Sequence, residues 1–228
     1  IDRASPYLFP PVITVETVIA EEDDPDENLG FGMIFFPGML FMAVLFTGQN
    51  LSADLWQERA SGTLRRIIGT PQTLWDFLFG KLAAHALSLL VISLAGLALG
   101  RWVFRLPLEN LLLGAVWTTF AGFVMLLLFT LLQQLSTSQR GGNLLTTVIL
   151  FPLIMLGGSF FPFEVMPDWL AVVGKLTPNG WSLVQLKAIL TGNLEAARLG
   201  FTTLLLAGTG ALLVGANLIR LRSFARGV

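Results

Sequence analysis

Residues 54–81, DLWQERASGTLRRIIGTPQTLWDFLFGK, decide how this chain is organised. They separate two long apolar runs and carry four basic side chains, those of Arg59, Arg65, Arg66 and Lys81. The segment is too polar to span a bilayer and too apolar to be a plain loop. We therefore expect an amphipathic element at a membrane surface, where such helices bury their apolar face at the headgroup boundary, and we expect the protein to meet a partner there.

The apolar runs around this segment predict an all-α, polytopic membrane protein. Of the 228 residues, 54% are hydrophobic and only 13% are charged, and the mean hydropathy is +0.73, whereas a soluble domain has about 25% charged residues. A helix needs about 20 apolar residues to cross roughly 30 Å of hydrocarbon. Five stretches meet this requirement, so we expect five transmembrane helices, at about residues 31–53, 82–100, 111–133, 143–161 and 196–219.

The basic residues predict the orientation of these spans. If residues 54–81 are cytoplasmic, the loop at 134–142 and the tail from Arg220 are cytoplasmic too. These three pieces contain eight basic and three acidic residues, which leaves six basic and twelve acidic residues on the other side. That distribution agrees with the positive-inside rule and predicts a protein of a bacterial-type inner (plasma) membrane with a cytoplasmic C-terminus.

The expected domain organisation follows from this orientation. Residues 1–30 form an extracytoplasmic lead-in, 31–222 the transmembrane domain and 223–228 a cytoplasmic tail. Because the stretch after Ile1 lacks the features of a signal peptide, an outer lead-in predicts one more span before Ile1, and six in the full protein. In the lead-in, Ile13–Ile19 predicts a short strand, and the acidic run Glu21–Asn28 is a solvated linker or, less simply, a calcium site.

Several local structures are expected within the transmembrane domain. Thr70 and Pro71 predict the start of a helix that enters the second span. Before it, Leu55–Ile68 forms either a surface helix or an ordinary loop; in the helix, Trp56 would lie in the membrane interface. Asn143 is expected to cap the fourth span. Beyond it, prolines interrupt the chain too often for a span, which predicts two short outer helices, the second from Trp181 to Leu190, with Trp169 and Trp181 in the aromatic belt.

Polar side chains inside the spans have two possible roles. Gln49 and Asn50 near the inner end of the first span either hydrogen-bond neighbouring helices or line a path. His85, the only histidine, either makes a helix contact or belongs to a relay.

The sequence lacks the usual signatures of chemistry. It has no cysteine and no phosphate-binding G-x-x-x-x-G-K-[S/T] loop, because Gly80-Lys81 is followed by Leu82. The G-G-S-F at Gly157–Phe160 lacks a neighbouring base for a serine hydrolase. Proton-driven carriers use ionised groups within the bilayer, and the spans have no such relay. Nothing in the charge pattern suggests nucleic acid.

Three motifs resemble one family. They are E58-R-A-S-G-T-L-R-R-I-I-G-T-P71 leading to G80-K81, F36-P-G38, and G157-G-S-F-F-P-F-E-V-M-P-D-W-L170 followed by T177-P-N-G-W181. Together with the order of the spans over residues 30–222, they resemble the membrane-domain (permease) subunits of type-2 ATP-binding-cassette (ABC-2 type) exporters.

The resemblance implies a permease subunit that is not itself an enzyme. Two copies of a partner ATPase subunit would hold ATP and Mg, and this chain would bind no cofactor. A second permease copy, identical or different, would complete a dimer in the lipid. The apolar first and fourth spans favour an amphipathic or lipophilic substrate, such as a drug, lipid or glycolipid, exported from the cytoplasm or inner leaflet. A secondary carrier or channel and a non-transporting membrane scaffold remain the alternatives.

The resemblance also implies three sets of site residues. The cytoplasmic coupling helix that docks on the ATPase would use Glu58, Arg59, Gly62, Thr63, Leu64, Arg65, Arg66 and Ile67. The translocation path would include Phe46, Gln49, Asn50, Thr147 and Met155. An outer re-entrant helical hairpin at Phe163–Leu190 would close the exit, with gate residues Phe161, Pro162, Met166, Pro167, Trp169, Pro178 and Trp181.

Overall fold

The computed structural model describes the backbone of residues 25–62 and 74–226, and the side chains of residues 30–62 and 76–221. All regular secondary structure in these ranges is helical, which confirms the all-α prediction. The strand expected at residues 13–19 and the helix start expected at residues 70–71 lie outside the described residues. The acidic run is not wholly a linker, because its last residues from Pro25 belong to the first long helix.

Five helices are long and apolar enough to cross a membrane, as predicted. They are α2 (Pro25–Ser52), α5 (Leu74–Trp102), α6 (Leu111–Leu135), α7 (Gln139–Leu156) and α10 (Ala196–Arg226). Four shorter helical elements connect them in the described chain: α3 (Asp54–Ala60), the 3₁₀ helix η1 (Phe163–Val165), α8 (Asp168–Leu176) and α9 (Pro178–Leu190). At about 1.5 Å per residue, α8 and α9 are too short to span a bilayer.

Helix α6 is the centre of the bundle. It packs against α2, α5, α7, α9 and α10, and 56% of its apolar span is buried, compared with 11% of the span in α10. Its fully buried Phe129 and Leu126 pack with Phe41 and Val44 of α2. The outward faces of the other long helices are therefore left to lipid or to a partner.

Glycines let the long helices approach closely. A Cβ added to Gly122 of α6 would collide with the Val44 side chain of α2. A Cβ on Gly96 or Gly100 of α5 would likewise collide with side chains of α2. Because lipid tails are as apolar as leucine, helix association in a bilayer relies on close packing and interhelical hydrogen bonds, and small residues such as glycine allow that packing.

Both ends of α7 and the start of α9 differ from the prediction. Helix α7 begins at Gln139, not at Asn143, because the Ser138 hydroxyl accepts a hydrogen bond from the Gly141 amide and caps the helix. It ends at Leu156 rather than Phe161, because Gly158 turns the chain with a φ of 78°. Helix α9 begins at Pro178 rather than Trp181, where Thr177 accepts from the Gly180 amide.

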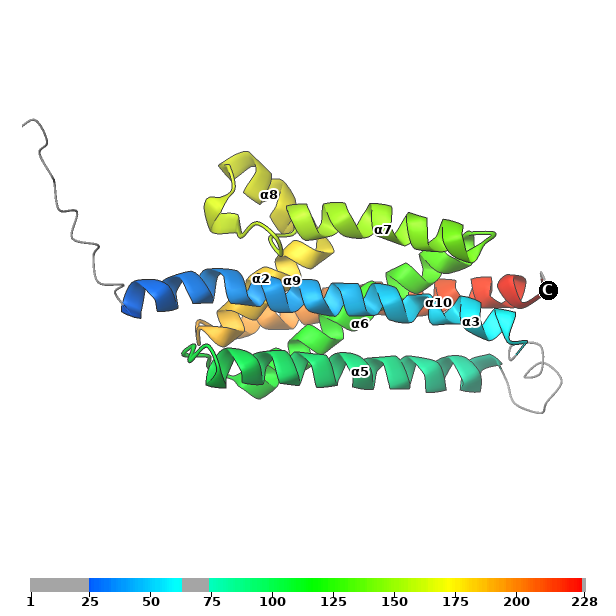
Figure 1. The fold of residues 1–228 in the computed structure, drawn as a ribbon, viewed down its shortest axis with the longest axis horizontal. Coiled ribbons are helices and arrows are strands. Elements are labelled where there is room, and N and C mark those ends of the chain that lie inside the picture. Colours follow the sequence, from blue (N-terminus) through cyan, green and yellow to red (C-terminus); the bar gives the residue numbers. More distant parts are fainter. Residues whose placement is uncertain (1–24, 63–73, 227–228) are drawn as a thin grey trace, which may run out of the picture.

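The connections gather at two opposite ends of the bundle (Figure 1). One end holds α3, the start of α5, the turn from α6 to α7 and the end of α10. The other end holds η1, α8 and the turn from α5 to α6. The described parts of the three segments that the charge pattern places on one side of the membrane thus lie at one end of the molecule.

A buried amide pair joins α10 to α6. The Gln134 side-chain amide donates to Asn217 Oδ1 at 2.7 Å, and Asn217 Nδ2 donates to the carbonyl oxygen of Leu127 at 3.0 Å. Asn217 is fully buried. Together with the packing of α10 on α6, these bonds hold α10 in its position along α6.

We expect Asn217→Leu to destabilise the fold by about 1–2 kcal/mol, because the Gln134 amide loses its acceptor inside the protein. Chemical denaturation in detergent micelles measures this loss. Thr209→Val is the control, because the Thr209 hydroxyl is exposed and bonds its own helix at Leu205 O. Equal stability of the two variants would contradict this role of Asn217.

Candidate functional site

Helix α3 follows α2 after a single intervening residue, Ala53 (Figure 1). It ends at Ala60 because Gly62 adopts the left-handed conformation, with a φ of 72°. The Ser61 and Gly62 amides then bond back to carbonyl groups in the last turn. The single helix expected over residues 55–68 is therefore wrong, since the structure breaks it before residue 63.

The two faces of α3 have different surroundings. Leu55 and Trp56 are buried against the bundle, so protein covers the Trp56 side chain, which was expected to contact the membrane interface. The Arg59 guanidinium lies over the Trp56 ring, 5.3 Å from its centre. Of the expected coupling residues, Glu58, Arg59 and Gly62 belong to α3 and its end, and the other five, residues 63–67, lie outside the described residues.

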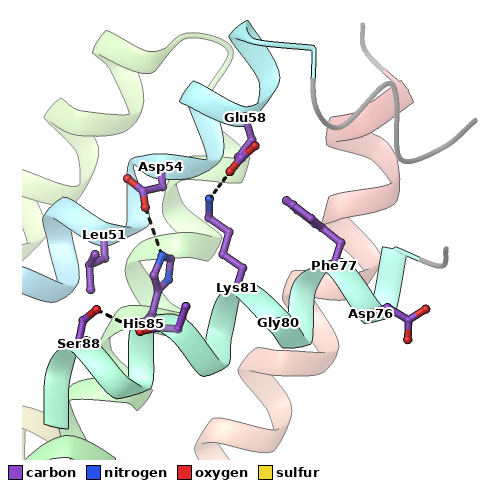
Figure 2. Close-up of a pocket in the computed structure, with 10 residues that line it drawn as sticks. Leu51, Asp54, Glu58, Asp76, Phe77, Gly80, Lys81, His85 and Ser88 are labelled. Atoms are coloured by element: carbon purple, nitrogen blue, oxygen red, sulfur yellow. Dashed lines mark hydrogen bonds and ion pairs between the residues drawn. The ribbon is translucent and has the colours of Figure 1, made fainter. Parts of the chain in front are cut away.

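An ion pair and a hydrogen bond join α3 to α5 (Figure 2). Glu58 Oε1 lies 3.1 Å from Lys81 Nζ, and Asp54 Oδ2 lies 3.3 Å from His85 Nε2. The partners are four residues apart on each helix, so both pairs lie on facing stripes. We call these four residues the charge ladder. Glu58, expected to contact an ATPase, is thus already paired within the chain, and His85 makes a helix contact.

A cavity of about 590 Å³ lies beside the charge ladder. Its lining includes the acidic residues Asp54, Glu58 and Asp76 together with Lys81 and His85, and the Asp76 side chain points away from the charge ladder (Figure 2). Among the described residues, no group of three or more His, Cys, Asp or Glu side chains could hold a metal ion. The full lining is Leu51, Asp54, Glu58, Asp76, Phe77, Gly80, Lys81, Ala84, His85 and Ser88.

Helices α2 and α7 meet along a second feature, which we call the α2–α7 seam. Gln49 Nε2 donates to Thr147 Oγ1 at 2.7 Å, so Gln49 forms a hydrogen bond between helices. The rings of Phe46 and Phe151 meet edge to face, with centroids 6.4 Å apart. Asn50, the residue after Gln49, is exposed.

Of the five residues expected to line a path, Phe46, Gln49 and Thr147 make these contacts, while Asn50 and Met155 are exposed residues of the same two helices. Met155 lies one helical turn beyond Phe151 on α7, and its side chain is exposed. The structure thus pairs Gln49 with Thr147, and Phe46 with a residue that sequence reasoning did not name. The i, i+4 spacing of Thr147, Phe151 and Met155 could have identified Phe151.

The expected gate residues lie at the other end of the bundle and do not form one cluster. Trp169 of α8 is 70% exposed, whereas Trp181 of α9 packs against the core. Pro162 is buried, and Phe161 is exposed and touches Phe160 edge to face. Of the rest, Met166 packs against the core, Pro167 is exposed and Pro178 starts α9.

Two of the sequence motifs meet at this end. A Cβ on Gly38 of α2 would lie 2.8 Å from the carbonyl oxygen of Ser159, in the turn that follows α7. The Asn179 amide donates to the carbonyl oxygen of Leu153 and to the Ser159 hydroxyl, and Lys187 forms an ion pair with Glu164 at 2.9 Å. Helices α8 and α9 are therefore fastened to α2 and α7 at the hairpin.

Comparison with known proteins finds several transport permeases. The chain is similar to the probable multidrug ABC transporter permease YbhR of Escherichia coli K12, with 28% identity over 66% of this chain and 42% of YbhR. It is 26% identical to the putative transport permease YvfS of Bacillus subtilis 168, over 74% of this chain and 72% of YvfS. It is 27% identical to the inner membrane transport permease YhhJ of E. coli K12, over 69% of this chain and 42% of YhhJ.

The matched region thus spans less than half of the two E. coli relatives. No solved structure shows a significant match to the chain. The family model described as "ABC-2 family transporter protein" matches residues 9–219, which include the whole of α3 and nearly all of the described spans. This chain therefore belongs to the ABC-2 family of transporter proteins.

Proposed function

We propose that this chain is the membrane-spanning permease subunit of an ATP-driven exporter, and that its partner ATPase docks at the end of the bundle that holds α3. The observation that carries the proposal is the charge ladder, which fastens a short helix at that end to the foot of a long span. A partner that pushes on α3 would move α5 with it. The positive-inside distribution supports a cytoplasmic location for this end and for the C-terminus.

The partner supplies the energy in this proposal. ATP and Mg bind to two copies of a separate ATPase subunit, because the sequence of this chain contains no phosphate-binding loop. ATP binding and hydrolysis then shift the bundle between inward-open and outward-open states. A second permease copy, identical or not, faces the first in the bilayer.

The α2–α7 seam is the proposed translocation path. Its exposed aromatic and thioether side chains, including Phe46, Phe151 and Met155, suit an amphipathic or lipophilic substrate that leaves the cytoplasm or the inner leaflet. The exposed amide of Asn50 supplies a polar contact near the same end as α3. The hairpin of α8 and α9 closes the opposite end of the path.

We expect ATP-driven export when the full-length protein is purified with its ATPase and reconstituted in liposomes. Transport of a fluorescent amphipathic dye should require ATP and Mg, and should persist when ionophores remove proton and sodium gradients. Transport that follows the gradients without nucleotide would identify a secondary carrier instead. A purified chain with no associated ATPase and no transport would favour a scaffold.

Reversing the charge of one side chain in the charge ladder should uncouple transport from ATP hydrolysis in the partner subunit. We expect Glu58→Lys to lower transport about tenfold, which corresponds to about 1.4 kcal/mol, because the introduced ammonium would face the ammonium of Lys81. Adding Lys81→Glu restores the ion pair and should recover transport to within about threefold of wild type. Liposome transport per ATP hydrolysed measures both effects.

The double variant also decides what Glu58 contacts. If Glu58→Lys with Lys81→Glu remains as defective as Glu58→Lys alone, the ladder is not the functional partner of Glu58, and its contact lies on the ATPase. Arg198→Glu, a charge reversal at the opposite end of the bundle, is the matched control and should leave coupling unchanged.

A further inference from the structure

The buried face of α3 begins a chain of hydrogen bonds that crosses two long helices. The Trp56 indole nitrogen donates to Gln133 Oε1 of α6 at 2.9 Å. Gln133 Nε2 in turn donates to Asn143 Oδ1 of α7 at 2.9 Å. The three side chains come from three different helices, and we call them the amide relay.

The middle residue of the amide relay cannot be replaced by a shorter or an apolar one. Gln133 is completely buried, and it uses its carbonyl oxygen toward α3 and its amide nitrogen toward α7. An indole N–H can only donate, so Trp56 fixes which end of the Gln133 amide faces it. The nitrogen is thereby directed at Asn143.

A glycine makes room for the amide relay. A Cβ added to Gly142 would collide with Gln133 Oε1 and would lie 3.1 Å from the Trp56 indole nitrogen. The first turns of α7 therefore pass directly over the bond between Trp56 and Gln133. This close approach is a second, independent sign that the positions of α3 and α7 depend on each other.

The amide relay ends one helical turn from the α2–α7 seam. The Thr146 hydroxyl donates to the carbonyl oxygen of Asn143 at 3.0 Å. Thr146 and Thr147 both face the Gln49 amide of α2, at 3.4 and 2.7 Å. A shift of Asn143 along or across the bundle would therefore displace the residues at which α2 and α7 meet.

We propose that the amide relay sets the position of the inner end of α7 relative to α3, and that Gln133 is a positioning residue for transport. This inference rests on the proposed function. The charge ladder ties α3 to α5, and the relay ties it through Gln133 of α6 to α7, so movement of α3 reaches the α7 side of the seam. Because neutral hydrogen bonds in a buried site are costly to break, α7 follows α3 instead of parting from it.

The test measures the distance between α3 and α7 in the complex with its ATPase in nanodiscs. The chain has no cysteine, so spin labels at Gln57→Cys on α3 and Leu144→Cys on α7, both exposed, give one clean pair. We expect this distance to be the same without nucleotide and with trapped ATP. In Gln133→Leu it should broaden and change with nucleotide.

Transport should respond in parallel. We expect Gln133→Leu to lower dye transport per ATP hydrolysed about tenfold, with ATP hydrolysis retained. Asn143→Leu removes the far end of the relay at an exposed position and should show the same uncoupling without a folding defect. Gln185→Leu is the matched control, because Gln185 is also buried and its amide nitrogen has no hydrogen-bond partner in the described structure.

The outcomes separate this inference from the proposed function. If the wild-type complex shows ATP-driven transport and both Gln133→Leu and Asn143→Leu match Gln185→Leu in distance and in transport, the relay has no positioning role. If the wild-type complex shows no ATP-driven transport, the proposed function fails and the inference fails with it. A nucleotide-dependent distance in wild type would also overturn the inference.

Discussion

The contact between Gly122 of α6 and Val44 of α2 is the constraint on which the rest of the structure depends. Because Gly122 has no side chain, the two helices approach closely and run side by side in a fixed register. Twelve residues beyond Val44 along the chain lies Trp56, and eleven residues beyond Gly122 lies Gln133. The same register therefore brings the indole of α3 within hydrogen-bond distance of the α6 amide.

At its two ends the bundle is held together by different kinds of contact. At one end, polar side chains connect α3 to its neighbours, through the charge ladder to α5 and through the amide relay to α6 and α7. At the other, glycine contacts and a few hydrogen bonds lock the α8–α9 hairpin against α2 and α7. A polar group inside a membrane protein that lacks a partner is costly, so the partnered networks at the α3 end resist independent movement of any single helix.

The sequence predicts the spans well because lipid imposes a simple rule on composition. Stretches without charge had to be helices of about 20 residues, and all five are present. It predicts helix ends less well, since these depend on single residues. Gly62 and Gly158 adopt left-handed conformations that end α3 and α7, and Ser138 competes successfully with Asn143 as a cap.

In the candidate site, too, the sequence shows local spacing but not which residues meet. The i, i+4 spacing of Asp54 with Glu58 and of Lys81 with His85 is visible in the sequence, but only the fold shows that the two stripes face each other. From the sequence alone, Trp56 looks like a tryptophan of the membrane interface. In the structure it donates a hydrogen bond to a residue 77 positions away in sequence. The sequence around Gln133 does not identify it as that partner, because Gln133 looks there like any other polar residue at the end of a span.

Photo-crosslinking tests most directly the proposed docking of a partner ATPase at α3. A photoreactive phenylalanine analogue placed at Gln57, on the exposed face of α3, is compared with one at Trp169 on the exposed face of α8, in membranes that contain the intact complex. The account predicts a crosslink to the ATPase subunit from position 57 and none from position 169. A crosslink from position 169, or none from 57, would contradict it.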